Sequence, residues 1–265
     1  MSHFERDTRD AYEGAANAWA SGPHVVYRHL AAALLDACPV AFEGATVLDV
    51  GAGTGVLGDE ARARGAWCVD ADVAVDMLTH AGRDSRRGIG ADGRRLPFRD
   101  ASFDVVAGNC SLSHVTDPER MLADAARVVN DDGALVFSAF PNSSDSHPAW
   151  AAVEAVLGEF GYERPDWYAH LKAASEPLVG TVEALTDLAA AVGLTAVEVA
   201  RTQVATDVDA PEALADWRLG MAQHAAFVAT LSADRRHAIR REAIDRIGSD
   251  PAPLHVDMLV LSARA

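Results

Sequence analysis

The chain has 265 residues, of which 49% are hydrophobic and 23% are charged. These shares are typical of a globular protein with a real core, so wholesale disorder and fibrous or low-complexity scaffolds are excluded. The 39 acidic residues outnumber the 23 basic ones, and the formal net charge is −16. A surface of that sign repels nucleic-acid phosphates and anionic lipid, so we expect neither nucleic acid nor a membrane as a partner.

Cysteine usage and the first residues indicate the compartment. Cys38, Cys68 and Cys110 are widely spaced and form no CxxC pair, which predicts neither a zinc site nor a disulfide-stapled secreted domain. The first ten residues mix both charge signs, and no apolar run reaches 18 residues. We therefore expect a cytoplasmic protein. A single lysine, Lys172, among the 23 basic residues indicates a GC-rich bacterial genome.

The first 140 residues alternate between two kinds of pattern. The first 40 are helical, interrupted at Ser21-Gly22-Pro23, with Ser21 as the expected N-cap of the second helix. Strands are then expected at 46–50, 66–71, 103–107 and 134–140, the last entered through a turn at 131–133. Helices are expected between them, up to residue 64 and over 75–81 and 118–129. This alternation predicts parallel strands joined by crossover helices.

Beyond Phe140 the alternation breaks. Residues 141–180 are rich in proline, serine and aromatics and predict an inserted helical cap. A helix over 181–191 and a strand over 194–200 follow. Two further helices, at 211–227 and 233–247, and a final strand at 255–262 complete the predicted elements.

Three glycines at alternate positions follow the first expected strand, in the sequence Asp49-Val-Gly-Ala-Gly-Thr-Gly55. Gly51 and Gly53 let a ligand approach the backbone closely, and the next helix directs free N–H groups at an anionic group. A dinucleotide site would need glycine at Val56, so a nicotinamide-dependent oxidoreductase is the least favoured function. The observed spacing instead resembles motif I of the class I S-adenosylmethionine-dependent methyltransferases.

That resemblance assigns roles to the first two motifs. It implies that Asp49, Gly51, Ala52 and Gly53 cradle the cofactor. The stretch 71–78 is similar to the family's V-D-x-S-x-x-M-L pattern, with alanine where serine is common. A bidentate carboxylate suits the two ribose hydroxyls, and both Asp70 and Asp72 qualify chemically. The pattern selects Asp72, with Val73 beside it and Met77 at the adenine face.

Two more segments resemble the family in the same order. The stretch 91–104 is similar to D-A-x-x-L-P-F-x-D-x-S-F-D, which implies that Asp92 accepts from the adenine amino group and that the Gly93 N–H reaches the ring. Asp104 is expected to anchor the strand entrance. The stretch 105–115 resembles the family's fourth strand, where the backbone carbonyl of Asn109 would meet the cofactor's ammonium.

The resemblance covers residues 47–140 and implies an α/β fold. We expect a Rossmann-like, doubly wound, seven-stranded sheet, mostly parallel, whose last two strands are antiparallel, with a helical cap. Residues 1–45 would form an N-terminal helical lid, and residues 46–265 the methyltransferase domain with cap insertions at 141–180 and 207–250. The implied cofactor is S-adenosylmethionine, with S-adenosylhomocysteine as the product.

The expected chemistry follows from the cofactor. Its methyl group is already activated on a sulfonium, so aligning the acceptor can supply about 7–11 kcal/mol through proximity and orientation. His114 is the candidate base if the acceptor must lose a proton. The alternative is that His114 only binds the loop backbone. No metal is expected, because the stretch Asn109-Cys110-Ser111 offers no carboxylate cluster.

Aromatic residues of the lid and cap are candidates for enclosing the acceptor. Near a sulfonium such rings gain about 0.5–2 kcal/mol of cation–π attraction, and a pocket they line favours an apolar or aromatic small molecule. Ordinary helix packing explains the same residues equally well. They are Tyr12, Trp19 and Tyr27 in the lid and Trp150, Trp167, Tyr168 and Trp217 in the cap.

The leading prediction is an enzyme that transfers a methyl group from S-adenosylmethionine to oxygen, nitrogen or carbon of a small molecule. The pattern is similar to the small-molecule methyltransferases that include quinone and secondary-metabolite enzymes, and secondary metabolism is the expected setting. Two alternatives stay open. The same fold and cofactor could promote a cyclisation or rearrangement without methylation, or the chain could be a non-catalytic cofactor-binding partner subunit.

Overall fold

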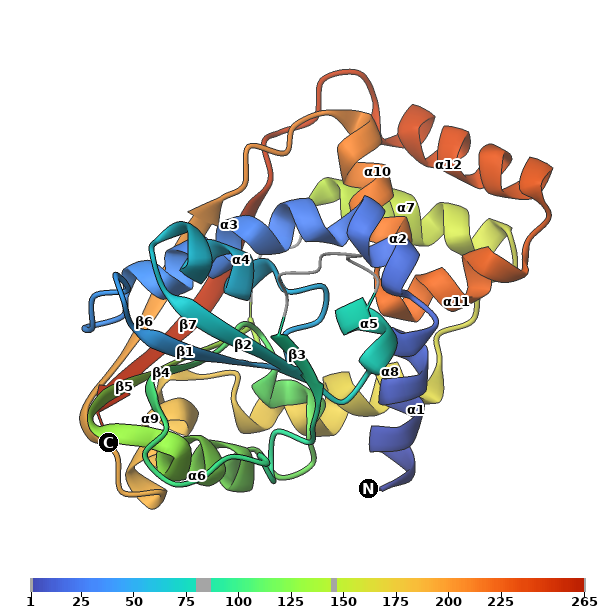
Figure 1. The fold of residues 1–265 in the computed structure, drawn as a ribbon. Helices are drawn as coiled ribbons and strands as arrows, with labels where there is room; N and C mark the ends of the chain where they lie inside the picture. Colours follow the sequence, from blue (N-terminus) through green and yellow to red (C-terminus); the bar gives the residue numbers. More distant parts are fainter. Residues whose placement is uncertain (1, 80–86, 144–146, 265) are drawn as a thin grey trace.

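The computed structural model describes residues 2–79, 87–143 and 147–264. In this part of the chain seven strands form one sheet with the order β3-β2-β1-β4-β5-β7-β6 (Figure 1). The first five of that order pair in parallel, whereas β7 is antiparallel to both β5 and β6. The predicted seven-stranded Rossmann-like sheet is thus confirmed. The strands are β1 (Thr46–Val50), β2 (Trp67–Asp72), β3 (Arg87–Gly90), β4 (Phe103–Gly108), β5 (Val129–Ala139), β6 (Thr195–Ala205) and β7 (His255–Arg264).

Helices cover both faces of the sheet, which explains why its central strands are apolar almost throughout. Because side chains alternate along a strand, neighbouring residues enter different cores. Val47 packs in the core beneath α3 (Pro23–Asp36) and α4 (Val56–Ala63). Leu48 packs in the opposite core, beneath α6 (Pro118–Val128) and α9 (Val182–Ala191). Figure 1 shows α6 and α9 on the opposite side of the sheet from α3 and α4.

Asp104 fastens the entrance of β4 to that of β1. Its Oδ2 accepts hydrogen bonds from the backbone N–H and the hydroxyl of Thr46, both at 2.7 Å. Its Oδ1 accepts from Asn130 at 2.9 Å. These donors lower the pKa of Asp104, the backbone N–H of Thr46 most strongly. The structural role expected for Asp104 is therefore what the structure shows.

The remaining helices stand at one end of the sheet. The cap helices α7, α10 and α12 pack on one another around a small core of their own that includes Val156, Leu157 and Ile239. The helix α1 runs beside α5, α8 and α11. These helices are α1 (His3–Glu13), α2 (Ala16–Ser21), α5 (Val75–Thr79), α7 (Pro148–Glu159), α8 (Asp166–His170), α10 (Pro211–Leu219), α11 (Ala222–Thr230) and α12 (Ala233–Ile247).

Several boundaries differ from the sequence prediction. Ser21 is not an N-cap: it ends α2, and its hydroxyl donates to the Asn17 carbonyl, while Gly22 takes the cap position of α3. The stretch 131–133 lies within β5 rather than in a turn, where the pairing with β4 is irregular. The predicted helix 211–227 is two helices that meet at residues 220–221. The predicted helix 75–81 is described to Thr79, and residues 80–81 lie outside the described residues.

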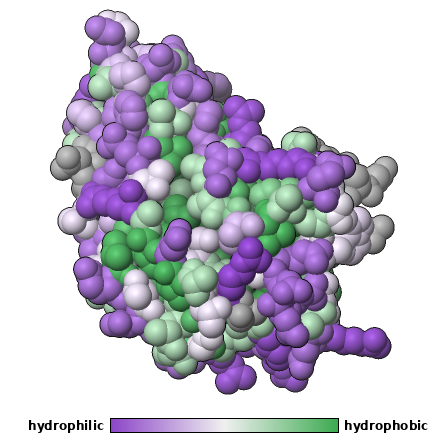
Figure 2. All heavy atoms as spheres, turned by 90° about the vertical axis from the view of Figure 1, so that its left-hand side faces the viewer, coloured by the Kyte–Doolittle hydropathy of each residue, from purple (hydrophilic) through white to green (hydrophobic). Residues whose placement is uncertain are grey.

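The surface mixes apolar and polar side chains. On the face seen in Figure 2, hydrophobic residues gather in patches between hydrophilic ones. Such mixing is ordinary, because apolar atoms contribute much of any folded surface. In the described part of the chain, no helix is both long and apolar enough to cross a membrane.

Candidate functional site

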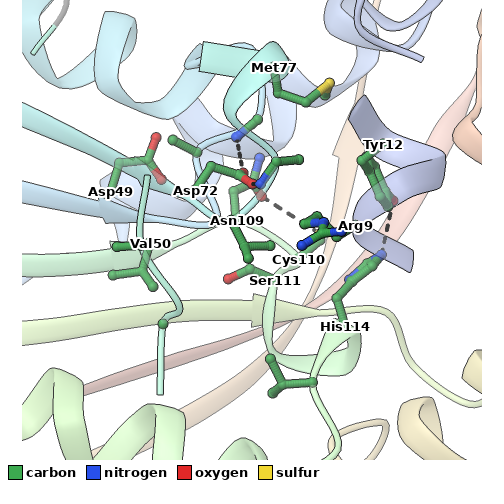
Figure 3. Close-up of a pocket in the computed structure, with 18 of the residues that line it drawn as sticks. Arg9, Tyr12, Asp49, Val50, Asp72, Met77, Asn109, Cys110, Ser111 and His114 are labelled. Atoms are coloured by element: carbon green, nitrogen blue, oxygen red, sulfur yellow. Dashed lines mark hydrogen bonds between the residues drawn. The ribbon is translucent and has the colours of Figure 1, made fainter. Parts of the chain in front are cut away.

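A pocket opens at the carboxyl ends of β1, β2 and β4, beneath α1 (Figure 3). This edge is where ligands bind in open α/β sheets, because the loops that leave the strands diverge there. All ten residues predicted to bind the cofactor line this one pocket. They are Asp49, Gly51, Ala52, Gly53, Asp72, Val73, Met77, Asp92, Gly93 and Asn109.

The glycine turn after β1 forms the floor of the pocket. Gly51 has a φ of +78° and Gly53 a φ of +55°, the left-handed region that favours glycine. A Cβ on Gly51 would lie only 2.5 Å from Cβ of Ser111, so the turn and the loop after β4 touch because no side chain separates them. The pattern of alternate glycines thus brings two strand ends together.

Asp72 lies at the end of β2 and spans this turn. Its Oδ2 accepts from the Gly53 N–H at 2.7 Å, and its Oδ1 accepts from the Ala74 N–H at 2.8 Å. Burial raises the pKa of Asp72, and the backbone N–H donors oppose that effect. Asp70, the chemical alternative, lies deeper and pairs with Arg62 at 2.7 Å. Of the two carboxylates, Asp72 is the one that lines the pocket.

Two buried oxygens in the pocket lack a partner among the described residues. Asp49 accepts the Gly58 N–H through Oδ2 at 3.2 Å, but its Oδ1 has no hydrogen bond. The Ser111 hydroxyl is likewise buried and unpaired within the described chain. Burial, and then the nearby Asp70, raise the pKa of Asp49 well above its usual range. Unpaired buried polar atoms are costly, so these two oxygens are candidates for hydrogen bonds to a bound ligand.

Asn109 follows β4, and its side chain serves the scaffold. Its Nδ2 donates to the Tyr27 carbonyl at 3.2 Å, and its Oδ1 accepts from Ser138 at 3.0 Å. These bonds tie α3 to the sheet and fix the backbone of Asn109 at the pocket wall. The next residue, Cys110, has a φ of +59°, which turns the chain sharply toward the ligand space.

Asp92 accepts hydrogen bonds from Arg94, a residue that the sequence prediction did not include. Arg94 donates through Nε to Oδ1 at 3.0 Å and through Nη2 to Oδ2 at 2.7 Å, and this fork lowers the pKa of Asp92. Arg94 also binds Glu5 on α1, a buried carboxylate that accepts from Thr116 as well. The S-x-x-E spacing of Ser2 and Glu5 could have predicted the start of α1. The contacts of Glu5 with Arg94 and Thr116 could not be predicted from the sequence, because these partners are 89 and 111 positions away.

His114 lines the pocket opposite the glycine turn, in a short helical turn at Leu112–His114. Its Nε2 shares a 2.9 Å hydrogen bond with the Tyr12 hydroxyl, and the two rings meet edge to face at 5.4 Å (Figure 3). Burial lowers the pKa of His114 to about 4, so the ring is neutral near pH 7. Burial raises the pKa of Tyr12, which keeps the phenol protonated.

The predicted aromatic residues separate into two groups. Tyr12, Trp19 and Tyr27 line the pocket, and Trp19 lies 5.5 Å from the ring of Tyr12 and 4.8 Å from that of Tyr27. Those three residues form what we call the aromatic wall. The four cap residues do not line this pocket.

The cap aromatics have other surroundings. Trp150 and Trp217 pack against each other at 5.6 Å, with Arg218 over both rings, in the core between the cap and α3. Trp167 lies behind Tyr12, with ring centroids 6.4 Å apart, and its neighbour Tyr168 packs on Trp167 and Lys172. Packing thus accounts for the placement of all four.

Among the described residues, no three His, Cys, Asp or Glu side chains are grouped so that they could hold a metal ion. The glycine turn, the acidic ends of β1 and β2 and the strand order resemble those of the class I S-adenosylmethionine-dependent methyltransferases.

Comparison with known proteins agrees with that class. Residues 48–137 match the family model described as a methyltransferase domain. The chain is similar to a demethylmenaquinone methyltransferase from Mycobacterium sp. (strain KMS), with 40% identity over 110 residues, which is 42% of this chain and 47% of the relative. The matched stretch thus spans about half the length of such curated relatives.

Solved structures share the fold. One is an S-adenosylmethionine-dependent methyltransferase from Thermotoga maritima, 14% identical, with a TM-score of 0.58 over 97% of this chain and 99% of that chain. Another is phosphoethanolamine N-methyltransferase 2 from Haemonchus contortus in complex with S-adenosylmethionine, 18% identical, with a TM-score of 0.54 over 88% of this chain and 51% of that one. Both likenesses extend well beyond the segment matched by the family model.

Proposed function

We propose that this chain is a cytoplasmic enzyme that binds S-adenosylmethionine beneath α1 and transfers its methyl group to a small molecule. One observation carries the proposal: residues 49–53, Asp72 and Asp92, which lie far apart in the sequence, line a single pocket. Relatives named demethylmenaquinone methyltransferase support a small acceptor. Because the match covers less than half of this chain, the acceptor itself can differ, and we place it in secondary metabolism.

Different residues of the pocket would bind different parts of the cofactor. The Asp72 carboxylate is held by two backbone N–H groups and keeps lone pairs for the two ribose hydroxyls. Asp49 Oδ1 and the Ser111 hydroxyl would receive the polar amino-acid end, which gives both buried oxygens a partner. Asp92 and the Gly93 N–H would read the adenine edge, with Met77 against its face.

When bound, the cofactor supplies a methyl group on a positively charged sulfur. The aromatic wall then has two effects. Its rings exclude water, which otherwise stabilises the more charged ground state, and their faces attract the sulfonium by about 0.5–2 kcal/mol. Such a wall favours an apolar or aromatic acceptor.

His114 would act where the acceptor has a proton to lose. The ring is neutral because burial lowers its pKa to about 4, and its unprotonated nitrogen would take the proton after giving up the hydrogen bond with the Tyr12 hydroxyl. The 2.9 Å bond to Tyr12 holds the ring toward the pocket. Transfer to a hydroxyl would move the acceptor proton to His114 while the methyl group moves to oxygen.

The test is calorimetric titration with S-adenosylhomocysteine. The wild type should bind, and Asp72→Ala should bind roughly 10- to 100-fold more weakly, because hydrogen bonds to a charged group are lost. Asp76→Ala is the matched control, since Asp76 is an exposed aspartate on the adjoining helix α5. Equal affinity of wild type and Asp72→Ala would contradict the assignment of the ribose site.

A second assay distinguishes methyl transfer from the alternatives. Methyl-labelled S-adenosylmethionine is incubated with a panel of small aromatic alcohols and amines, and both the labelled product and S-adenosylhomocysteine are measured. Transfer releases the two in equal amounts. Product without S-adenosylhomocysteine would instead indicate a cyclisation or rearrangement, and binding without any product over the panel would favour a non-catalytic partner subunit.

A further inference from the structure

The helix α1 is tied to the loops that hold the two ends of the proposed cofactor. Near its start, Glu5 reaches the loop after β3 through Arg94 and the loop after β4 through Thr116. Near its end, Tyr12 reaches His114. Residues of α1 between these ties, including Thr8 and Arg9, line the pocket directly. The helix therefore closes one side of the ligand space.

Arg94 lies at the centre of the contacts that Glu5 makes with the two loops. Its guanidinium lies between two carboxylates, Asp92 at 2.7 Å and Glu5. The Glu5 side chain is only 6% exposed and that of Arg94 only 15%, so neither has much freedom to move. Thr116 adds two donors to the same Glu5 oxygen, at 3.2 Å from its N–H and 2.6 Å from its hydroxyl. Helix α1 and the two loops thus meet at one partly buried ionic cluster.

The fork of Arg94 also sets the orientation of Asp92. Both oxygens of Asp92 accept from the side chain of Arg94, and its Oδ1 accepts from the Arg94 backbone N–H as well. A carboxylate held in this way is prepared for one further donor without losing rotational freedom when the ligand arrives. If α1 moved away, Arg94 would lose Glu5, and the restraint on Asp92 would weaken.

We propose that Arg94 is a positioning residue that couples occupation of the adenine site to the closed position of α1. This inference rests on the proposed function, since it takes the ligand at Asp92 to be the adenosyl group. Coupling of this kind is reciprocal: closure of α1 strengthens adenosyl binding, and adenosyl binding stabilises the closed helix. A ligand without the adenine ring would leave α1 largely free to open.

The experiment measures amide hydrogen exchange in α1, with and without S-adenosylhomocysteine as the probe. In the wild type the ligand should slow exchange over residues 6–13. In Arg94→Met the ligand should still bind, about 5- to 10-fold more weakly in line with ordinary coupling free energies, but the added protection of α1 should be lost. Arg95→Met is the matched control, because Arg95 is the exposed neighbour, and it should behave as the wild type.

A second variant weakens the Arg94–Glu5 interaction by changing Glu5 instead of Arg94. Glu5→Gln keeps an oxygen for the Ser2 N–H that Glu5 now accepts at 2.7 Å, so the start of α1 is preserved while the charge facing Arg94 is removed. It should reproduce the Arg94→Met result. The loss of affinity in the double variant should be smaller than the sum of the two single losses, because both variants remove the shared Arg94–Glu5 interaction.

Four outcomes would overturn the coupling. Full ligand protection of α1 in Arg94→Met and Glu5→Gln would refute it, as would additive losses of affinity in the double variant. Binding of S-adenosylhomocysteine by the wild type with no change in α1 exchange would refute the coupling and leave the proposed function standing. Absence of binding by the wild type would overturn both.

Discussion

The hydroxyl oxygen of Tyr12 lies 2.9 Å from Nε2 of His114, although the two residues are 102 positions apart in the chain. The pair joins the first helix to the loop after β4, and both residues line the pocket. His114 is neutral and Tyr12 is protonated near pH 7, so their contact is an uncharged hydrogen bond. A neutral imidazole held in one orientation is suited to accept a proton.

Replacement of His114 should lower kcat more than replacement of Tyr12. His114→Gln should lower kcat by about 100-fold or more for a hydroxyl acceptor, the usual contribution of a general base. Tyr12→Phe should lower kcat less, because the base remains but loses its orientation. Steady-state kinetics check both, with titration of S-adenosylhomocysteine to show that cofactor affinity changes little. Unchanged kcat in His114→Gln would exclude the histidine as the base.

The pH profile of kcat provides a separate test of His114. Because burial lowers its pKa to about 4, the ring stays unprotonated from pH 8 down to about pH 5. The rate should therefore be level over that range and fall only below it. A profile that bends near pH 6.5 instead would show an exposed, ordinary histidine at this step.

The lowered pKa of His114 also predicts how the free energy of unfolding depends on pH. The unfolded chain titrates His114 near its ordinary pKa of 6.5 and the folded chain near 4, so the unfolded state binds more protons between those values. Stability should fall as the pH drops from 6.5 toward 4, by about 2–3 kcal/mol from this residue. Urea unfolding at several pH values measures the loss. It should be smaller in His114→Gln.

Gly51 should tolerate no side chain, and Gly44 supplies its control. Both have left-handed φ values, +78° and +74°, so alanine at either position costs about 1–2 kcal/mol of backbone strain. Only at Gly51 would the new Cβ meet Ser111, at 2.5 Å, whereas nothing lies within 4 Å at Gly44. Gly51→Ala should therefore lose a further 1–3 kcal/mol of stability.

Binding should separate the two glycine variants more clearly than stability does. Gly51→Ala displaces the loop that carries Ser111 and should weaken binding of S-adenosylhomocysteine severely. Gly44→Ala should bind as the wild type does, because Gly44 lies in the loop before β1 and does not line the pocket. Equal affinities for the two variants would show that the turn does not carry the ligand.

Asp104 should matter for folding and not for the ligand. Asp104→Ala removes the acceptor of three hydrogen bonds, two from Thr46 and one from Asn130, and should cost about 2–3 kcal/mol. Asp100→Ala is a useful comparison, since that side chain is 79% exposed and an ion pair of its kind contributes at most about 1 kcal/mol. Chemical denaturation measures both, and cofactor affinity should be unchanged in either variant.

The sequence predicted those parts of the fold whose signals are local. The strand at 46–50 and the helix at 118–129 have strong periodicity and are found almost where expected. Strand β3 was not located by its residues, because Arg87–Gly90 is four residues long with two glycines and one isoleucine. An irregular pairing kept residues 131–133 in β5 although their composition is typical of a turn.

The residues of the site likewise differ in whether the sequence could predict them. The residues that line the pocket from strand ends belong to compact motifs, and the resemblance of these motifs to those of a known family allowed the residues to be named. Glu5 could not, because its partners Arg94 and Thr116 are 89 and 111 positions away and no pattern connects them. Trp150 and Trp217 show the reverse problem: an aromatic residue in a cap segment looks the same in sequence whether it faces a ligand or packs in a core.

The position of β7 has a consequence for biosynthesis. This strand lies between β5 and β6, so it supplies the hydrogen-bonding partner for an edge of each. Helices α10 to α12 lie between β6 and β7 in the chain, so all three are synthesised before the strand that pairs with β6. We therefore expect the edge of β5 and the strand β6 to stay unpaired in the nascent chain until residues 255–264 are made, an interval in which a chaperone that shields such edges would act.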